Sequence, residues 1–311
     1  MKKIAFVFPG QGSQSVGMLN AWADNQTVQQ AIQVANEALG QDLGALIANG
    51  PDTDLNLTTN TQPAMLLAAV AMFNAWVDAG GALPDIVAGH SLGEYSALTA
   101  SGVLHLADAV KLVRVRANAM QDAVPVGVGA MAAVLNLDDA QIRQVCIEAA
   151  QGQVVEPVNF NAPGQIVIAG HKEAVERACE LAKAAGARRA VLLPVSAPFH
   201  SSLLEPAAQV LAEALKRVEL DSPRIPVINN VDVEWPDDIN DIKSALARQA
   251  YHPVRWVETI EKMRDLGVTH IVECGPGKVL AGLVKRIDKD MVVLSINDPA
   301  SLEHTLNSLQ N

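Results

Sequence analysis

Short apolar runs alternate with longer segments of helical periodicity over most of the chain. Runs that are apolar on both faces are typical of parallel strands that helices cover on both sides. Such runs predict strands at Ile4–Phe8, Asp85–Ala88, Ile225–Asn229, His270–Glu273 and Met291–Ile296. The helical pattern predicts helices at Gln62–Ala79, Leu106–Asp122, Ser201–Val218, Val257–Leu266 and Lys278–Ile287. The alternation therefore indicates an α/β fold with a parallel sheet.

The middle of the chain follows a different order. Strands and helices are predicted there in the order βαββαβ, which is typical of a ferredoxin-like domain. The six elements are Met131–Leu137, Asp138–Ala150, Val154–Phe160, Gln165–Ala169, Lys172–Ala185 and Arg189–Val195. A glycine-rich linker precedes them, and Ser196-Ala197-Pro198 follows them. We predict an inserted ferredoxin-like domain at residues 127–196 and a discontinuous larger α/β domain at residues 1–126 and 197–311.

Charge and hydropathy narrow the class of protein. The chain has 311 residues, and its 23 basic and 34 acidic residues give a net charge of −11. This balance argues against a broad surface for nucleic acid or for an anionic membrane. The apolar run after Met1-Lys2-Lys3 is too short for a signal peptide, and the uncharged stretch Leu55–Val77 is apolar only from Ala64, too short to span a membrane. We expect a soluble cytoplasmic protein.

The three cysteines, Cys146, Cys179 and Cys274, lie far apart and have no CxxC spacing. This arrangement predicts neither a disulfide framework nor a zinc site. Each cysteine lies in an apolar stretch, so we expect all three to be small buried core residues.

The pentapeptide Gly89-His90-Ser91-Leu92-Gly93 fits the pattern G-x-S-x-G in the context that the pattern requires. The predicted strand Asp85–Ala88 precedes it, and a helix-like run follows from Glu94. A strand-to-helix elbow exposes the serine hydroxyl beside the N–H groups and positive dipole of a helix N-terminus. The alternative is an ordinary glycine-rich turn with an N-capping serine. The context favours Ser91 as a nucleophile and predicts that the domain of residues 1–126 and 197–311 is α/β-hydrolase-like and catalytic.

A nucleophilic serine needs a base, normally a histidine within hydrogen-bond distance. His200 ends the segment Val195–His200, on the return from the inserted domain, where the two predicted domains meet. Clefts at such junctions are favoured ligand sites. His90 lies inside the elbow and is expected to point away from Ser91. Surface or capping roles are expected for His105, His171, His252, His270 and His304. His200 is therefore the candidate base, and no aspartate can be assigned as a third member.

The loop Phe8–Gln14 follows the first predicted strand and is rich in glycine. It lacks the lysine of a phosphate-binding loop, so nucleotide binding is not indicated. At the carboxyl end of a strand, such a loop can place a second oxyanion donor beside the N–H of Leu92. A purely structural turn explains the loop equally well.

Arg116 is the most informative charged residue. On the predicted helix Leu106–Asp122 it shares one apolar stripe with Ala109, Val113 and Met120. A guanidinium on a face that points to the core must find an anion or bear a large desolvation cost. One interpretation is a structural salt bridge to an Asp or Glu. The other is a site for a substrate carboxylate, which arginine binds through two hydrogen bonds.

Six segments of the chain combine these features. They are Phe8-Pro9-Gly10-Gln11-Gly12, Gly89-His90-Ser91-Leu92-Gly93-Glu94, Arg116, Ser196-Ala197-Pro198-Phe199-His200, Gln249 and Gly275-Pro276-Gly277. In this order, over nearly the whole length, the chain resembles the bacterial malonyl-CoA:acyl carrier protein transacylases of type II fatty acid synthesis.

The resemblance implies a role for each matching residue. Ser91 would be the nucleophile and His200 its base. Gln11 and the main chain of Leu92 would form the oxyanion hole. Gln249 would orient His200, often through a main-chain carbonyl, which accounts for the missing aspartate.

The resemblance also implies the substrate. Arg116 would hold the malonyl carboxylate, and the bulky Phe199 would leave little room for a branched group such as methylmalonyl. Malonyl-CoA and acyl carrier protein are the implied partners, with no nucleic acid and no membrane, and we expect a monomer. No metal or redox cofactor is implied.

Two other functions fit the same residues. A serine thioesterase or hydrolase would share Ser91 and His200, and a standalone malonyl acyltransferase of a polyketide synthase would differ only in its carrier protein.

Because acyl carrier proteins are acidic, docking of the carrier on this acidic chain needs a local basic cluster. Lys278, Lys285 and Arg286 are the candidates for it.

Overall fold

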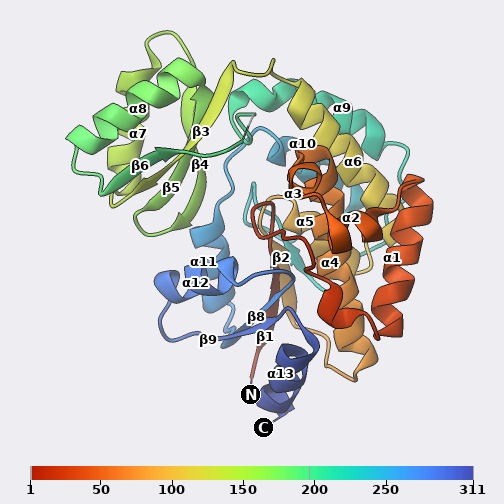
Figure 1. Cartoon of the computed structure of the whole chain (residues 1–311). Coiled ribbons are helices and arrows are strands. Elements are labelled where there is room, and N and C mark those ends of the chain that lie inside the picture. Colours follow the sequence, from red (N-terminus) through yellow and green to blue (C-terminus); the bar gives the residue numbers. More distant parts are fainter. Residues whose placement is uncertain (1, 196, 311) are drawn as a thin grey trace.

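The computed structural model describes residues 2–195 and 197–310 and contains two separate sheets (Figure 1). The larger sheet has five strands in the order β7-β2-β1-β8-β9, and every neighbouring pair is parallel. The smaller sheet is antiparallel, with the order β4-β5-β3-β6. The predicted α/β fold with a parallel sheet is therefore confirmed.

The strands of the parallel sheet are β1 (Ile4–Phe8), β2 (Ile86–Gly89), β7 (Val227–Ile228), β8 (His270–Cys274) and β9 (Val292–Ile296). Four of them agree with the prediction to within one residue at each end. The prediction of a strand over residues 225–229 is wrong in length, because β7 has only two residues. Pro226 has no N–H to donate to a ladder, and the N–H of Asn229 donates to the carbonyl of Glu234 and turns the chain.

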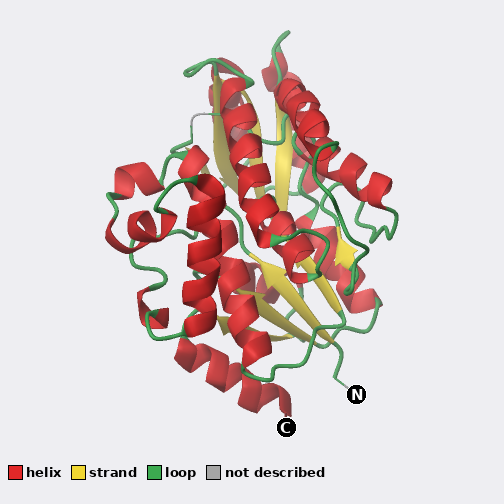
Figure 2. Cartoon of the chain, turned by 90° about the vertical axis from the view of Figure 1, so that its right-hand side faces the viewer, coloured by secondary structure: helices red, strands yellow, loops and turns green. Residues whose placement is uncertain are grey.

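Helices cover both faces of this sheet (Figure 1), and those on one face lie in front of it in Figure 2. They are α1 (Gln26–Leu39), α2 (Leu43–Asn49), α3 (Asp52–Leu55), α4 (Thr58–Asp78), α5 (Gly93–Ala100), α6 (Leu106–Asp122), α9 (Glu205–Leu215), α10 (Ile239–Gln249), α11 (Trp256–Asp265), α12 (Val279–Ile287) and α13 (Pro299–Gln310), with 3-10 turns η1 (Asn20–Trp22) and η2 (Ser202–Leu204). The bounds of α6 are as predicted, and those of α11 and α12 differ by one residue. The helices α1, α2, α3, α10 and α13 were not predicted.

Two predicted helices begin elsewhere. The helix expected over residues 201–218 is the 3-10 turn η2 followed by α9, which has Pro206 in its first turn, where a missing N–H costs little. Helix α4 begins at Thr58, four residues before the predicted start, and holds Pro63 in its interior. The hydroxyl of Thr61 donates to the carbonyls of Leu55 and Leu57 and stabilises this first turn.

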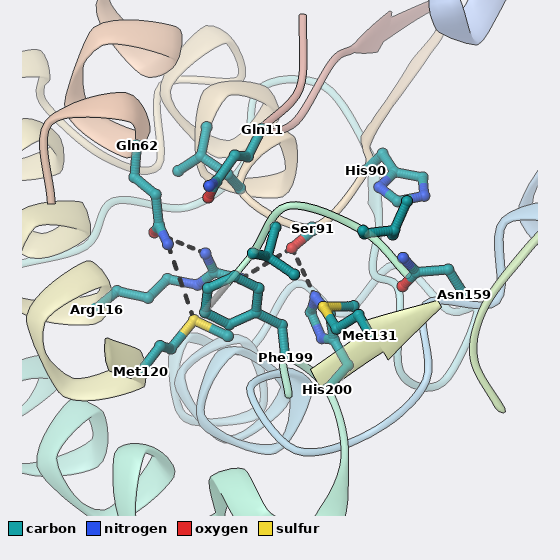
Figure 3. Close-up of a pocket in the computed structure, with 13 residues that line it drawn as sticks. Gln11, Gln62, His90, Ser91, Arg116, Met120, Met131, Asn159, Phe199 and His200 are labelled. Carbon is teal, nitrogen blue, oxygen red and sulfur yellow. Dashed lines mark hydrogen bonds between the residues drawn. The ribbon is translucent and has the colours of Figure 1, made fainter. Parts of the chain in front are cut away.

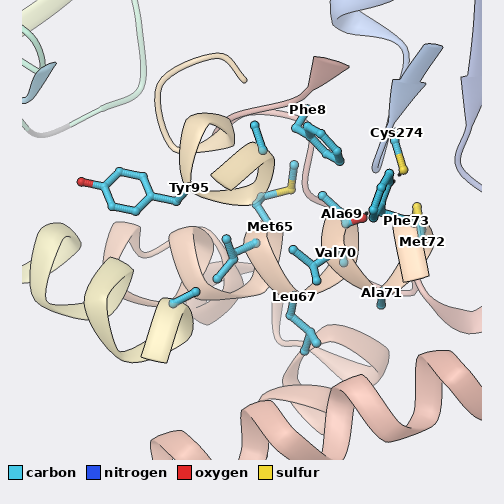
Figure 4. Close-up of a cluster of buried hydrophobic side chains, with 14 of the residues drawn as sticks. Phe8, Met65, Leu67, Ala69, Val70, Ala71, Met72, Phe73, Tyr95 and Cys274 are labelled. Carbon is cyan, nitrogen blue, oxygen red and sulfur yellow. Dashed lines mark hydrogen bonds between the residues drawn. The ribbon is translucent and has the colours of Figure 1, made fainter. Parts of the chain in front are cut away.

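Alternate residues of β1 pack on opposite faces of the parallel sheet. Phe6 and Phe8 join a core with α1, α4 and α6, part of which is drawn in Figure 4. Ala5 and Val7 join a second core with α11 and α12. Burial on both faces explains why the predicted strands are apolar without alternation. Cys274 lies in the first core, and Cys146 and Cys179 are also buried, as predicted.

The smaller sheet and its two helices lie at one end of the molecule, at the upper left in Figure 1. Their order along the chain is the predicted βαββαβ: β3 (Gly129–Leu135), α7 (Asp139–Ala150), β4 (Val155–Ala162), β5 (Gln165–His171), α8 (Lys172–Ala184) and β6 (Arg189–Leu192). One face of the sheet forms its own core with α7 and α8. The other face packs on α6 and on the segment around Phe199. Ser196, the predicted last residue of this domain, lies outside the described residues.

None of the helices within the described residues has both the length and the apolar character that crossing a membrane requires.

Candidate active site

Ser91 lies at the turn between β2 and α5, with a positive φ of 53°. This strained conformation is characteristic of a nucleophile elbow. A Cβ atom on Gly89 would lie 1.8 Å from the carbonyl oxygen of Gly93, and one on Gly93 would lie 2.1 Å from that of Phe8. Both positions therefore require glycine, because the turn brings strand and helix backbones together.

The side chain of His200 reaches the hydroxyl of Ser91 (Figure 3). Its Nε2 lies 2.7 Å from Ser91 Oγ, and its Nδ1 lies 2.7 Å from the main-chain carbonyl oxygen of Gln249. A carbonyl oxygen can only accept a hydrogen bond, so Nδ1 carries the hydrogen and Nε2 is free to accept from the serine. In this tautomer the proton of Ser91 points at a nitrogen that can remove it.

The surroundings of His200 keep it neutral. Its side chain is buried. Burial and then the positive charge of Arg116 lower the pKa of His200 to about 3, against the opposing effect of the hydrogen bond to Gln249. At neutral pH the ring is therefore an uncharged acceptor, as a base must be.

Arg116 is 1% exposed and projects from α6 toward Ser91 (Figure 3). Its Nη1 donates to Gln62 Oε1 at 2.7 Å, and its Nη2 donates to Gln249 Oε1 at 2.9 Å and to Ser91 Oγ at 3.1 Å. The guanidinium also lies over the ring of Tyr95. No ion pair between described residues includes Arg116, so the alternative of a structural salt bridge is wrong.

A buried polar network supports the elbow from behind. Asn230 Oδ1 accepts from the N–H of Ser91 at 2.8 Å, and its Nδ2 donates to the carbonyl of Gly89 at 2.7 Å. Glu94 Oε2 accepts from the N–H of Asn230 at 2.8 Å and from Gln249 Nε2 at 3.1 Å. These bonds hold both sides of the strained residue in place.

A cavity of about 140 Å³ opens beside Ser91, and every predicted site residue except Gln249 lines it. Gln249 is fully buried behind it. Phe199 lies on the apolar side of the cavity with Met120, Met131, Leu193 and Val195.

Gln11 and Leu92 both line the cavity, one from the loop after β1 and the other from the turn before α5. The side chain of Gln11 donates to Thr58 Oγ1 at 3.1 Å, and Leu92 immediately precedes α5. Among hydrogen bonds between described residues, none has the main-chain N–H of Gln11 or Leu92 as its donor.

His90 is turned to the small sheet rather than to Ser91, as expected. Its Nε2 lies 2.7 Å from Oδ1 of Asn161 on β4, and its ring packs against Trp256. Burial lowers the pKa of His90. The histidine of the elbow therefore contacts the small sheet.

The basic residues considered for docking lie on α12 or directly before it. Lys278 is exposed, whereas Lys285 donates to the carbonyl of Met291, and Arg286 donates to Gln165 on the small sheet. The turn before α12 lies beside the loop that carries Gln11, because Gly277 approaches Ser13.

Sequence reasoning missed four polar residues of the site: Gln62, Glu94, Asn159 and Asn230. Gln62 and Glu94 are both buried, but Thr58-Thr59-Asn60-Thr61 precedes Gln62 and the helix of Glu94 also holds Ser96 and Thr99, so their surroundings in the sequence do not mark them. Asn230 follows a predicted strand directly, at the sheet edge where parallel-sheet proteins bind ligands. Nothing in the pattern of β4 singles out Asn159. The described residues hold no cluster of His, Cys, Asp and Glu suited to a metal ion.

Comparison with known proteins gives one consistent family. The model of the acyl transferase domain family matches residues 5–299. The malonyl CoA-acyl carrier protein transacylase of Salmonella typhimurium is 53% identical over 98% of this chain and 99% of its own. The crystal structure of the acyl-carrier-protein S-malonyltransferase from Burkholderia pseudomallei is 62% identical, with a TM-score of 0.97 over 98% of this chain and 99% of that one. A type II PKS acyl-carrier protein in complex with its malonyl-transacylase is a further match, with 50% identity and a TM-score of 0.97 over 99% of this chain and 100% of that one.

Proposed function

Since the chain belongs to the acyl transferase domain family and, within it, to the malonyl CoA-acyl carrier protein transacylases, we propose that it transfers malonyl groups from coenzyme A to acyl carrier protein in fatty acid biosynthesis. The transfer proceeds in two steps through a malonyl ester of Ser91. Such a ping-pong route lets one site serve two large substrates in turn.

In the first step Ser91 Oγ attacks the thioester carbon of malonyl-CoA while His200 Nε2 accepts the hydroxyl proton. The C–S bond breaks as the tetrahedral intermediate collapses, and the protonated His200 returns a proton to the leaving thiolate. In the second step the phosphopantetheine thiol of the carrier gives its proton to His200 and attacks the ester carbon. As the tetrahedral intermediate collapses, the ester C–O bond breaks, the malonyl group stays on the carrier sulfur, and His200 returns the proton to Ser91 Oγ. Gln249 orients the base through its carbonyl. Because this acid–base chemistry needs only these side chains, we propose no cofactor.

The N–H groups of Gln11 and Leu92 would stabilise the oxyanion of each tetrahedral intermediate. Leu92 lies at the N-terminus of α5, where the helix dipole adds positive potential. A cavity that both residues line supports this assignment.

The observation that carries the proposal is the position of Arg116. A fully buried guanidinium that forms no ion pair with any described carboxylate lies within 3.1 Å of Ser91 Oγ. A malonyl carboxylate could form a bidentate ion pair with this guanidinium. Because the charge of Arg116 lowers the pKa of His200, pairing that charge with malonyl would also make His200 a stronger base. Malonyl-CoA thus assists its own transfer, whereas a neutral acyl group does not.

Phe199 would limit the size of the acyl group. It is 9% exposed and narrows the apolar side of the cavity. The additional methyl of methylmalonyl would meet this ring.

The carrier protein would dock beside α12. No lysine or arginine occurs between Lys3 and Lys111, a stretch with nine Asp and Glu residues. An acidic carrier is repelled by that region and would approach the basic residues near the turn Gly275–Gly277. One chain supplies every proposed residue of the site, so we propose that the enzyme acts as a monomer. We also propose that it is cytoplasmic.

We also propose that residues 127–196 form an inserted ferredoxin-like domain and that residues 1–126 and 197–311 form an α/β-hydrolase-like domain. The βαββαβ order and the separate core around α7 and α8 support the first assignment. The elbow between β2 and α5 supports the second.

The test is mass spectrometry of the intact protein after incubation with malonyl-CoA. We expect one malonyl adduct on Ser91, none on the Ser91→Ala variant, and rapid loss of the adduct when carrier protein with its thiol is added. An adduct that persists on Ser91→Ala would refute the assignment. Rapid loss in water alone would favour the thioesterase or hydrolase, and preference for a polyketide carrier would favour the polyketide acyltransferase.

A further inference from the structure

Glu94 is a buried charged side chain that the proposed mechanism does not use. It is 2% exposed, and no ion pair between described residues includes it. Its Oε2 accepts from the N–H of Asn230 and from Gln249 Nε2. A carboxylate buried without a bonded cation is costly. Its position therefore calls for a functional explanation.

The contacts of Glu94 fix the orientation of Gln249. The Nε2 of this amide donates toward Glu94, toward the carbonyl of Ser91 at 3.0 Å and toward Asn230 Oδ1 at 3.2 Å, while its Oε1 accepts from Arg116. The reverse orientation would set Oε1 against three acceptors and the NH2 group against a guanidinium. The charged acceptor contributes most to this choice, because hydrogen bonds to ionised groups are the strongest.

Gln249 in turn connects this carboxylate to the base. Its main-chain carbonyl accepts from His200 Nδ1. In a Ser-His-Asp triad an aspartate holds that nitrogen directly and stabilises the imidazolium that forms during the reaction. Here the uncharged carbonyl of Gln249 orients His200. The negative charge lies on Glu94, on the far side of Gln249 from His200.

We propose that Glu94 is a positioning residue that replaces the acid of a Ser-His-Asp triad but acts indirectly. It fixes the side chain of Gln249, whose carbonyl orients His200, and its negative charge opposes the positive charge of Arg116 near His200. The inference rests on the proposed function of Ser91 and His200. According to this inference, Glu94 assists acyl transfer from malonyl-CoA and from acetyl-CoA equally, and Arg116 alone discriminates between the two donors.

The charged and titratable groups that face Glu94 are Arg116 from α6, Tyr95 from α5 and Asp232 after β7. Asp232 stays ionised, since both terminal nitrogens of Arg248 bond it, at 2.8 and 2.7 Å, and lower its pKa. Burial raises the pKa of Glu94 to about 7. Glu94 is therefore charged above neutral pH and loses its charge below it, whereas the pKa of His200, about 3, lies outside this range.

The experiment measures the rate of malonyl-enzyme formation by rapid quench between about pH 5.5 and pH 9, a range centred near the pKa of Glu94. In the unaltered protein we expect the rate to rise through pH 7. Glu94→Gln keeps the shape and the acceptor but not the charge, so its rate should be flat with pH and about tenfold lower on the plateau, the lower end of the loss seen when a group that orients a metal-binding side chain is removed. The loss should be equal for malonyl-CoA and acetyl-CoA, and Glu94→Asp should recover part of the rate and of the pH step.

Glu273→Gln is the matched control. Glu273 is also a buried carboxylate with a pKa raised by burial to about 7, and it accepts from the N–H groups of Leu280 and Ala281, away from the site. The Glu273→Gln variant should keep both the plateau rate and the rise in rate through pH 7.

A pH-independent rate in the unaltered protein, a step that Glu273→Gln removes, or a Glu94→Gln variant that keeps the step would each overturn the inference. The first of these needs no variant to fold. If the unaltered protein forms no malonyl adduct at all, the proposed function fails instead.

Discussion

The two walls of the cavity are built in different ways. One wall is formed by elements packed on the parallel sheet, and it holds Ser91 and Arg116 in a buried network of hydrogen bonds. The opposite wall, from β3, β4 and the segment after β6, is mainly apolar, with Met131 and Val195, and Asn159 on β4 is its polar exception. A charge is recognised only by groups held in a fixed geometry, whereas size is recognised by filled volume. The polar wall should therefore choose the charge of the acyl group, and the apolar wall its size.

The largest effect is expected from breaking the polar wall. Arg116→Ala removes two hydrogen bonds to the malonyl carboxylate, each worth roughly 1.5–3 kcal/mol, so kcat/KM for malonyl-CoA should fall on the order of a hundredfold or more. Acetyl-CoA should be used equally well or better, because no unpaired cation remains. Arg116→Lys should also lose activity, since an ammonium cannot form the planar pair. The measurement is acyl-enzyme formation from each donor.

Thermal melts of the same variants serve as the control. Equal failure with both donors and a lower melting temperature would mean that Arg116 only stabilises the fold. Unchanged malonyl transfer by a folded Arg116→Ala variant would show that Arg116 does not bind the malonyl carboxylate.

A smaller effect is expected from the apolar wall. Phe199→Ala opens space beside the ester, and one methyl group in an apolar pocket is worth roughly tenfold in discrimination. Use of methylmalonyl-CoA relative to malonyl-CoA should rise by about this factor, while acetyl-CoA is used no better than before. Steady-state assays with the three donors check this. If the ratio of methylmalonyl to malonyl does not change, Phe199 does not limit size.

The smallest effect is expected outside the cavity. Lys278→Glu should raise KM for carrier protein about two- to fivefold, because a single exposed charge contributes up to about 1 kcal/mol. KM for malonyl-CoA should not change. Lys216→Glu, which reverses an exposed lysine paired with Glu213 after α9, is the matched control. Equal increases for both substrates would assign Lys278 to coenzyme A instead.

The apolar framework of the fold could be predicted because its signal is local. Strands such as β1 and helices such as α6 follow from runs and periodicity within a few residues. Helices α1 and α10 were missed, because their polar exposed faces, rich in Gln, Asn and Asp, obscure the pattern. The shortening of β7 depends on a turn at Asn229 that the run itself does not reveal.

The candidate site could be predicted only in part, for a related reason. Ser91 was found from its own turn, and Arg116 from the helix stripe on which it lies. The network behind them joins residues that lie 155 positions apart, as Glu94 and Gln249 do. No spacing rule relates such positions, and only the folded chain brings them together.

The most direct test of the contrast between the walls is one competition experiment. Equal amounts of malonyl-, acetyl- and methylmalonyl-CoA are mixed with the unaltered protein, with Arg116→Ala and with Phe199→Ala, and the mass of each intact adduct is read. The account predicts malonyl on the unaltered protein, a shift to acetyl on Arg116→Ala and a gain of methylmalonyl on Phe199→Ala. It is contradicted if Arg116→Ala still selects malonyl, or if Phe199→Ala gains acetyl rather than methylmalonyl.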